Sequence, residues 1–497
     1  MSAEVLLRDI RVAGAGSELL PTGDPVDLLI CGGIIVDIAP SGNLRHGGEV
    51  FDGEGCWAIP GLWDHHVHTV QWALAAQREP LGAARSASEA ARLMASVSAL
   101  GDGRRVGSGY RDALWTEPPS RALLDAATGT TPTYLINADV HSVWLNTAAL
   151  RREGFIGADD DGVLREAPAF EISRRLNAAD SNVADGAVQQ AGRRAAARGV
   201  VGVVDFDMAW NPEAWARRVA GGFSSHRVEC AVYPAELERA IAEGLATGSE
   251  IDGTNGLVRM GPLKVISDGS LGTRTAACSH PYTDGAEGTG MLNVSADELH
   301  ALLVRAAGAG LEAAVHAIGD VATTIALDAF TATGIQGTIE HAQLVRYADL
   351  VRFARLGVDA SVQPQHAMDD RRLVDRLWAA QTSVAYPLAS LDAAGAGLRF
   401  GSDAPVAPLD PWQAIASAVT RIDADHDTPW RPEERIPIER ALRASSHHGT
   451  RGSAEIAPGA LADIALCAED PRDADADALR TMEIAATLVG GRFTYGG

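Results

Sequence analysis

The amino-acid sequence predicts an α/β protein, a (β/α)8 TIM barrel joined to a small β-sandwich. The chain has 497 residues, too many for one small core. Between residues 61 and 454, short β-branched runs alternate with Ala-rich stretches of helical period, as parallel βα units require. Strand-like runs flank this region on both sides, so the barrel is expected to carry a second, smaller β domain.

The two ends of the chain are expected to build this β domain together. Strand-like runs cover residues 5–12, 27–31, 33–38, 458–466 and 483–492. Gly32 and Gly33 separate two of the runs and suit a tight hairpin turn. We therefore expect residues 1–60 and 455–497 to form one β-sandwich.

Eight runs within residues 61–454 are expected to be the barrel strands, and eight such units make a TIM barrel the economical choice. They are the run that ends in His68 and residues 199–206, 227–233, 263–268, 312–316, 337–341, 358–363 and 398–403.

One segment breaks this rhythm. Residues 72–190 lie between the first and second expected strands, far more than an ordinary βα connection needs. The segment has helical stretches and a strand-like run at 133–137. We expect an insertion that covers the barrel mouth and shapes the substrate pocket.

Composition excludes several classes of partner. The net charge of −23 disfavours nucleic acid and anionic membranes, because phosphate binding needs clustered Lys and Arg. The five cysteines are scattered, which disfavours a disulfide framework or a structural zinc site. The chain shows neither a signal peptide nor an apolar run of the ~18 residues that a membrane span needs. We expect a cytoplasmic protein with a small-molecule substrate, and a homodimer is the default assembly.

The first expected barrel strand ends in a pair of histidines. Side chains two residues apart on a strand point the same way, so His66 and His68 can reach one metal ion. Four other expected strands end in Lys264, His316, His341 and Asp403. Each alone has an ordinary structural explanation, but in a TIM barrel such strand ends converge on the catalytic face.

These positions resemble the metal-binding motifs of the amidohydrolase superfamily, metal-dependent hydrolases on a distorted TIM barrel. The closer resemblance is to the YtcJ-like branch, which includes N-substituted formamide deformylase. The motifs that carry it lie at residues 60–68, 139–150, 263–276, 315–320, 339–343, 361–366, 401–406 and 459–464.

The resemblance implies a role for each strand-end residue. His66, His68 and Asp403 would bind a more buried metal ion, and His316 and His341 a more exposed one. Lys264 would bridge the two as a carboxylated lysine, because an ammonium group has no lone pair to offer a cation. Zinc suits this ligand set, with iron, manganese and cobalt left open, and either one or two ions would be bound.

The implied reaction is hydrolysis of a C–N bond in an amide, formamide or cyclic amide. A metal-bound hydroxide would attack the carbonyl, and Asp403 would act as the catalytic base and then as the acid. The substrate itself is left open among N-formyl amines, acylated amino compounds and cyclic ureas.

Further residues are candidates for contact with the substrate. They are His141, Trp144 and Asn146 in the insertion, Arg274 after the fourth strand, and Gln363 and His366 at the seventh. For the insertion residues the alternative is that they only fold the insertion. His65, His447 and His448 are expected to be structural.

Two other functions stay open at this point. A mononuclear deaminase of the same superfamily usually lacks the lysine and has a His-x-x-Glu pattern, whereas here Asp320 stands four residues after His316. A catalytically inactive scaffold would have lost ligands, whereas all six positions are present.

Overall fold

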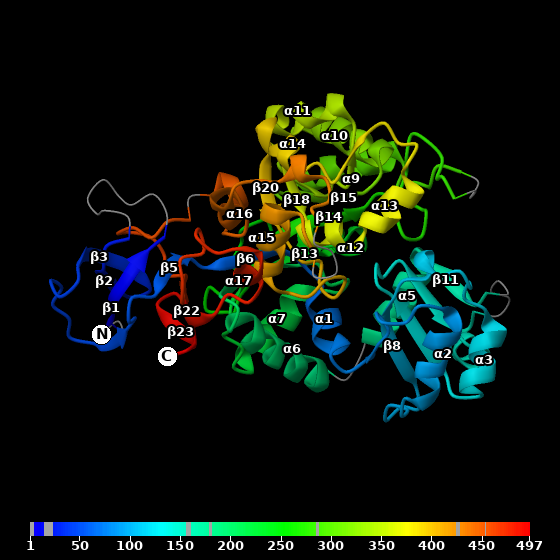
Figure 1. Ribbon diagram of the computed structural model, residues 1–497, viewed down its shortest axis with the longest axis horizontal. Helices are drawn as coiled ribbons and strands as arrows, with labels where there is room; N and C mark the ends of the chain where they lie inside the picture. Colours follow the sequence, from blue (N-terminus) through cyan, green and yellow to red (C-terminus); the bar gives the residue numbers. More distant parts are fainter. Residues whose placement is uncertain are drawn as a thin grey trace.

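The structure, a computed structural model, has three parts that lie side by side (Figure 1). It describes residues 4–13, 23–155, 161–177, 181–284, 288–423, 428–452 and 454–497. A β-sheet domain with strands from both ends of the chain lies at one side, the barrel in the middle, and the insertion forms a separate lobe on the other side.

The central part is a barrel of eight parallel strands, which confirms the predicted fold class. The strand order is β20-β18-β16-β15-β14-β13-β12-β6. The first and last strands meet where the Asp403 amide donates to the His66 carbonyl at 2.7 Å. The strands are β6 (Leu62–Val67), β12 (Val200–Asp205), β13 (Arg227–Val232), β14 (Val258–Ile266), β15 (Ala313–Ala317), β16 (Gly337–His341), β18 (Asp359–Val362) and β20 (Gly397–Phe400).

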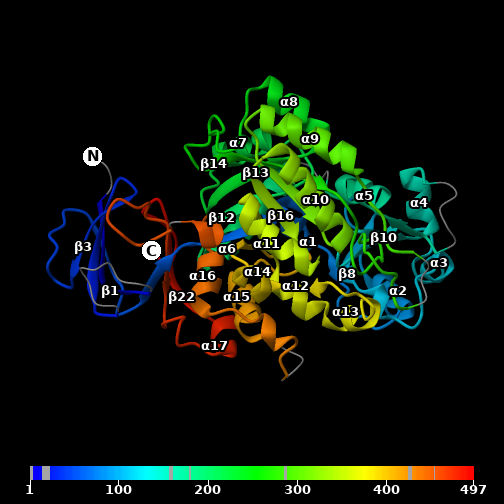
Figure 2. The same ribbon diagram turned by 90° about the horizontal axis from the view of Figure 1, so that it is seen from above.

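Amphipathic helices pack around this sheet and bury its outer face, as Figure 2 shows from above. Their apolar sides and the strands form one large hydrophobic core. These helices are α1 (Thr69–Ala75), α6 (Ser181–Ala196), α7 (Asn211–Ala220), α8 (Leu237–Ala242), α9 (Ala296–Gly308), α10 (Asp320–Thr333), α11 (Tyr347–Leu356), α14 (Leu388–Ala393), α15 (Pro411–Thr420) and α16 (Ile438–Ala444).

The flanking sheet takes strands from both chain ends. Its order is β23-β22-β21-β5-β1-β2-β3, and β4 pairs with β1. Gly32 and Gly33 join β2 to β3 with φ of 59° and 83°, the left-handed backbone of a type I′ hairpin turn. The strands are β1 (Glu4–Val12), β2 (Val26–Cys31), β3 (Ile34–Pro40), β4 (Glu49–Asp52), β5 (Trp57–Pro60), β21 (Ile464–Cys467), β22 (Ile484–Val489) and β23 (Arg492–Tyr495).

The insertion is an α/β lobe with a sheet and two apolar clusters of its own. The strand expected at 133–137 is the middle one of its five strands. The lobe consists of β7 (Glu79–Pro80), β8 (Arg105–Tyr110), β9 (Thr133–Asn137), β10 (Ser142–Leu145) and β11 (Val163–Arg165), with α2 (Ala87–Ser96), α3 (Arg121–Thr128), α4 (Thr147–Glu153) and α5 (Ala167–Asn177).

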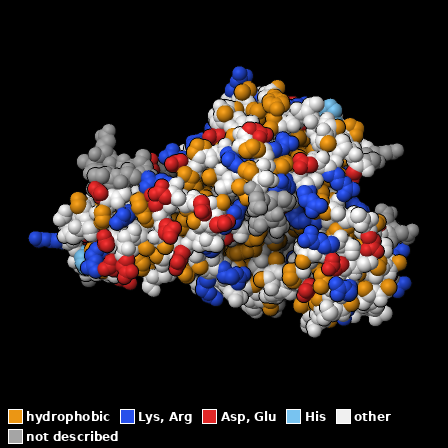
Figure 3. All heavy atoms as spheres, viewed as in Figure 1, with side chains coloured by type: hydrophobic (Ala, Val, Ile, Leu, Met, Phe, Trp, Pro, Cys, Tyr) orange, Lys and Arg blue, Asp and Glu red, His pale blue; other side chains and the backbone are white. Residues whose placement is uncertain are grey.

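The surface seen in Figure 3 carries acidic and basic side chains side by side. In the described part of the chain, no helix is long and apolar enough to cross a membrane.

Candidate metal centre and active-site cavity

The six predicted ligands lie at the carboxyl end of the barrel strands or directly after it. His66 is on β6 and His68 follows it, Lys264 is on β14, His316 on β15, His341 on β16, and Asp403 follows β20. All six are at least nine-tenths buried. Parallel strands bring their ends to one face, which is why residues up to 337 positions apart in sequence gather at one point.

His66, His68 and Asp403 are spaced as ligands of one ion would be. Oδ1 of Asp403 lies 3.5 Å from Nε2 of His66 and 3.3 Å from Nε2 of His68. A tetrahedral zinc ion with bonds of ~2.1 Å places its ligand atoms ~3.4 Å apart. His341 offers a further ligand atom within 4.8 Å of those of His66 and Asp403. These residues therefore fit a divalent metal ion.

Hydrogen bonds fix which nitrogen of each imidazole is available as a ligand. Nδ1 of His66 donates to Glu340 at 2.6 Å, and Nδ1 of His341 donates to the side-chain carbonyl of Gln363 at 2.8 Å. In both rings Nε2 is left to bind the metal. In His316 the other nitrogen is available. Its Nε2 lies 3.2 Å from the Gly269 carbonyl, so Nδ1 is the nitrogen left to bind a metal.

The protonation state of His66 suits a ligand. Burial, followed by the nearby Lys264, lowers the pKa of His66 to about 4. Its imidazole is therefore neutral near pH 7, and a neutral imidazole has the lone pair that a metal ion needs.

Lys264 lies within the ligand cluster. Its Nζ is 3.5 Å from Nε2 of His66 and 4.4 Å from the centre of the Phe206 ring. Burial lowers the pKa of Lys264 to about 8, although Glu340 and Asp403 act in the opposite direction. The neutral amine, the form that can react with carbon dioxide, is thus more accessible than in a solvated lysine.

The backbone at two of the predicted ligands is unusual. His341 and Asp403 have φ of 73° and 56°, in the left-handed region that side chains other than Gly seldom adopt. Such conformations persist where the surroundings hold them and are frequent at functional sites. Asp64 supports this arrangement, since its Oδ1 accepts from the backbone N–H groups of His66 and Ser402.

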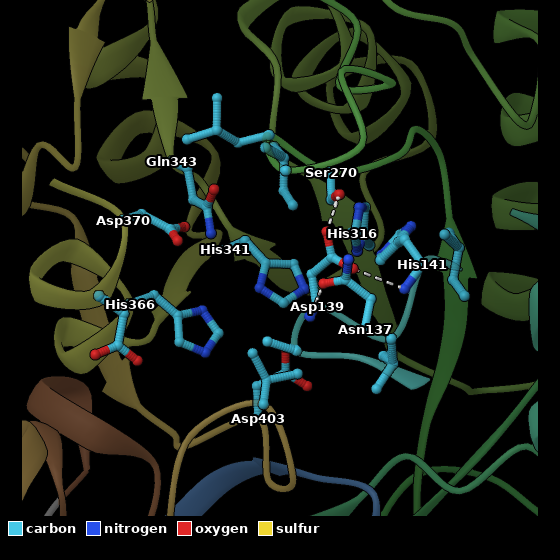
Figure 4. A pocket seen from close by; sticks show the side chains of 18 of the residues that line it. Asn137, Asp139, His141, Ser270, His316, His341, Gln343, His366, Asp370 and Asp403 are labelled. Carbon is cyan, nitrogen blue, oxygen red and sulfur yellow. Dashed lines mark hydrogen bonds between the residues drawn. The ribbon is translucent and has the colours of Figure 1, made fainter. Parts of the chain in front are cut away.

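An open cavity lies above this cluster (Figure 4). The barrel supplies one side and the insertion the other, through residues 137–141 at the end of β9. The insertion thus contributes directly to the walls of the cavity.

His141 is a titratable residue of the insertion that lies beside the predicted metal ligands. It lines the cavity, and its ring centre is 5.5 Å from that of His316. Burial disfavours its charged form, but Glu166, 3.0 Å from Nδ1, outweighs this and raises the pKa of His141 to about 9. Glu166 also accepts a hydrogen bond from Thr275, which lies in the loop after β14. This hydrogen bond connects the insertion to the barrel.

Three of the substrate-contact candidates do not line the cavity. Trp144 is fully buried in the apolar core of the insertion. Asn146 caps α4 by accepting from Ala149 and also accepts from the Thr133 amide. Arg274 forms an ion pair with Asp284 at 2.6 Å. These three side chains contact residues of their own segments, through core packing, helix capping and an ion pair respectively.

The last two candidates differ from each other. Gln363 does not line the cavity. Its side-chain carbonyl accepts the hydrogen bond from Nδ1 of His341 and so orients that ring. His366 does line it, with its ring stacked 6.4 Å from that of His341. Its Nε2 is buried with no hydrogen-bond partner among the described residues.

Several residues at the site were not singled out from the sequence. Glu340 and Glu166 position imidazoles, and Asp139, Gln343 and Asp370 line the cavity. Only Glu340 carried a usable signal: it precedes His341 in an apolar strand, and a carboxylate there needs a buried partner.

His447 and His448 lie elsewhere, beside Glu229. Nε2 of His447 donates to Glu229 at 3.0 Å, and the His447 ring stacks on that of Trp63 with ring centres 4.2 Å apart. Ligand atoms of Glu229, His447 and His448 lie close enough together to hold an ion. The stacking and the pairing are sufficient for the structural role expected from the sequence.

The chain resembles known proteins over nearly its whole length. It is 27% identical to Protein LONG AFTER FAR-RED 3 of Arabidopsis thaliana, over 99% of this chain and 95% of that one. It is 25% identical to the putative amidohydrolase YtcJ of Bacillus subtilis, over 89% of each chain. N-substituted formamide deformylase of Arthrobacter pascens is 28% identical over 48% of this chain and 46% of its own.

A solved structure supports the same assignment. An uncharacterised metal-dependent hydrolase from Pyrococcus horikoshii superimposes with a TM-score of 0.79 at 25% identity, covering 96% of this chain and 99% of that one. The model of the amidohydrolase family matches residues 49–495. These similarities show that the chain belongs to the amidohydrolase family, in its YtcJ-like branch, and is a metal-dependent hydrolase.

Proposed function

We propose that this protein hydrolyses a C–N amide-type bond of a small molecule, at a centre held by His66, His68, Lys264, His316, His341 and Asp403. The observation that carries the proposal is the convergence of Asp403 with two imidazole nitrogens at 3.3 and 3.5 Å beneath an open cavity. Divalent ions held there would lower the pKa of water and polarise the scissile carbonyl.

The residues of the chain divide the remaining work. Asp403 faces the cavity and is the group placed to take a proton from the attacking water and return it to the leaving nitrogen. Glu340 and Gln363 orient the imidazoles of His66 and His341. Lys264, as its carbamate, would supply an anionic bridging ligand.

The bond class has support from relatives. N-substituted formamide deformylase is named for cleavage of a formamide. Residues 60–68 and 263–276 resemble the motifs of that branch. Deamination is disfavoured, because Asp320 does not line the cavity. It accepts instead from Ser279 and Ser383.

Metal analysis and a substrate screen test the proposal. The purified protein should carry one to two divalent ions per chain, and the zinc-loaded protein should hydrolyse some of a panel of N-formyl and N-acyl amines. Asp403→Asn should lower kcat on the order of a thousandfold while the circular dichroism spectrum is unchanged. Asp297→Asn, the same change at an exposed position on α9, is the matched control. A metal-free protein, or full activity of Asp403→Asn, would contradict the proposal.

A further inference from the structure

The cavity above the metal centre is strongly acidic. Besides Asp403, four carboxylates line it. Asp112 and Asp139 come from the insertion, and Asp369 and Asp370 follow the seventh barrel strand. One pair therefore lies on the insertion side of the cavity and the other on the barrel side.

The cationic side chain at this wall is already paired. Of the described residues that line the cavity, Arg111 is the only Arg or Lys besides Lys264. Its Nη2 lies 3.2 Å from Asp369 and its Nη1 3.5 Å from Asp370. The guanidinium fork is thus directed at two protein carboxylates, and a substrate carboxylate would have to displace them.

Two buried polar atoms at the cavity wall have no partner among the described residues. They are the side-chain carbonyl oxygen of Gln343 and Nε2 of His366. Gln343 and His366 are 4% and 5% exposed, and both line the cavity. Figure 4 shows them with Asp370 on the same side as His341. An unpaired buried acceptor is costly, and a ligand N–H group would satisfy the Gln343 oxygen.

We propose that this wall is a subsite for a cationic nitrogen group, so that the enzyme favours substrates with an amine, amidine or guanidine away from the scissile bond and disfavours those with a free carboxylate. N-acylated diamines fit this class, whereas N-acyl amino acids do not. The identity of the hydrolysed bond rests on the proposed function. The charge preference rests on Arg111, Asp369, Asp370 and Gln343.

A binding experiment tests the subsite without turnover. Benzamidine and benzamide have nearly the same shape, but only the amidine is charged at neutral pH. Isothermal titration calorimetry on the zinc-loaded protein should give benzamidine about tenfold tighter binding, with a preference that falls as salt rises. Equal affinities, or a preference for benzamide, would overturn the proposal.

Variants locate the effect. Asp369→Asn combined with Asp370→Asn should abolish the preference for benzamidine, since it removes both charges and releases Arg111. Gln343→Leu, which changes no charge, should reduce it. Asp297→Asn, exposed on α9, should leave it unchanged. A preference that survives loss of Asp369 and Asp370 would also overturn the proposal.

Turnover separates this inference from the proposed function. N-formyl benzylamines with a 4-aminomethyl, 4-methyl or 4-carboxyl group should rank in that order in kcat/KM, and the variant that frees Arg111 should raise the value for the carboxylate. If no compound of the series is hydrolysed while benzamidine is preferred, the function proposal fails for this class and the subsite stands. If the series is hydrolysed without regard to charge, the subsite fails and the function stands.

Discussion

Glu340 accepts a hydrogen bond from Nδ1 of His66 at 2.6 Å, across 274 residues of sequence. Both side chains are 1% exposed. Burial raises the pKa of Glu340. The hydrogen bond from His66 and the positive charge of Lys264 outweigh burial and lower this pKa to about 2. The carboxylate is therefore anionic and fixes the orientation of the His66 ring.

Replacement of Glu340 tests this relationship. Glu340→Gln should weaken metal binding by roughly 10- to 100-fold, the usual effect of losing a carboxylate behind a ligating imidazole. Competition with a chromophoric chelator measures the affinity. Glu238→Gln, exposed on α8, is the control. Unchanged affinity in Glu340→Gln would show that His66 does not depend on this carboxylate.

Asp320 should make stability depend on pH. Burial raises the pKa of Asp320, but hydrogen bonds from Ser279 and Ser383 outweigh it and hold the pKa below the ordinary 3.8. A depressed pKa stabilises the folded state above the ordinary value, and this contribution is lost as pH falls through the folded pKa. The urea midpoint of Asp320→Asn should therefore lie below that of the wild type at pH 6, and the gap should narrow below about pH 4.

A surface carboxylate provides the control for this difference in urea midpoint. Asp297→Asn should follow the wild-type curve, because the Asp297 side chain is exposed. A gap for Asp320→Asn that stays constant from pH 6 to the acid limit would contradict the assignment.

Trp144 should matter for stability. It is fully buried in the insertion, so Trp144→Ala should cost about 3–5 kcal/mol in the unfolding of that lobe. Leu100→Ala, at a side chain 43% exposed, should cost far less. Limited proteolysis of the insertion and urea titration measure both. A variant with native stability but raised KM would restore Trp144 to a role in substrate binding.

Two glycine-to-alanine changes should have opposite signs. At Gly202 on β12 a Cβ would lie 2.1 Å from the indole of Trp63, so Gly202→Ala should destabilise by about 1–3 kcal/mol. At Gly186 on α6 a Cβ would meet open space, so Gly186→Ala should stabilise by up to about 1 kcal/mol. Thermal unfolding of the two variants checks this, and shifts of the same sign would contradict it.

The sequence predicted the barrel well because its signals are local. Strand period and β-branched runs placed all eight strands, although β14 begins at Val258, five residues before the expected start at Leu263. The short strands β4, β5 and β23 were not predicted as strands, because four residues give too little period to recognise.

The candidate site divides in the same way. The sequence by itself singled out the six candidate ligands, because each stands at or near the end of a barrel strand and parallel strands must bring their ends together. Only the tertiary structure decided that His141 and Asp139 face the cavity while Trp144 and Asn146 do not. It also decided that Arg111 is held by Asp369 and Asp370. Those contacts join segments far apart in the chain, and they depend on how the insertion packs against the barrel, which no local pattern records.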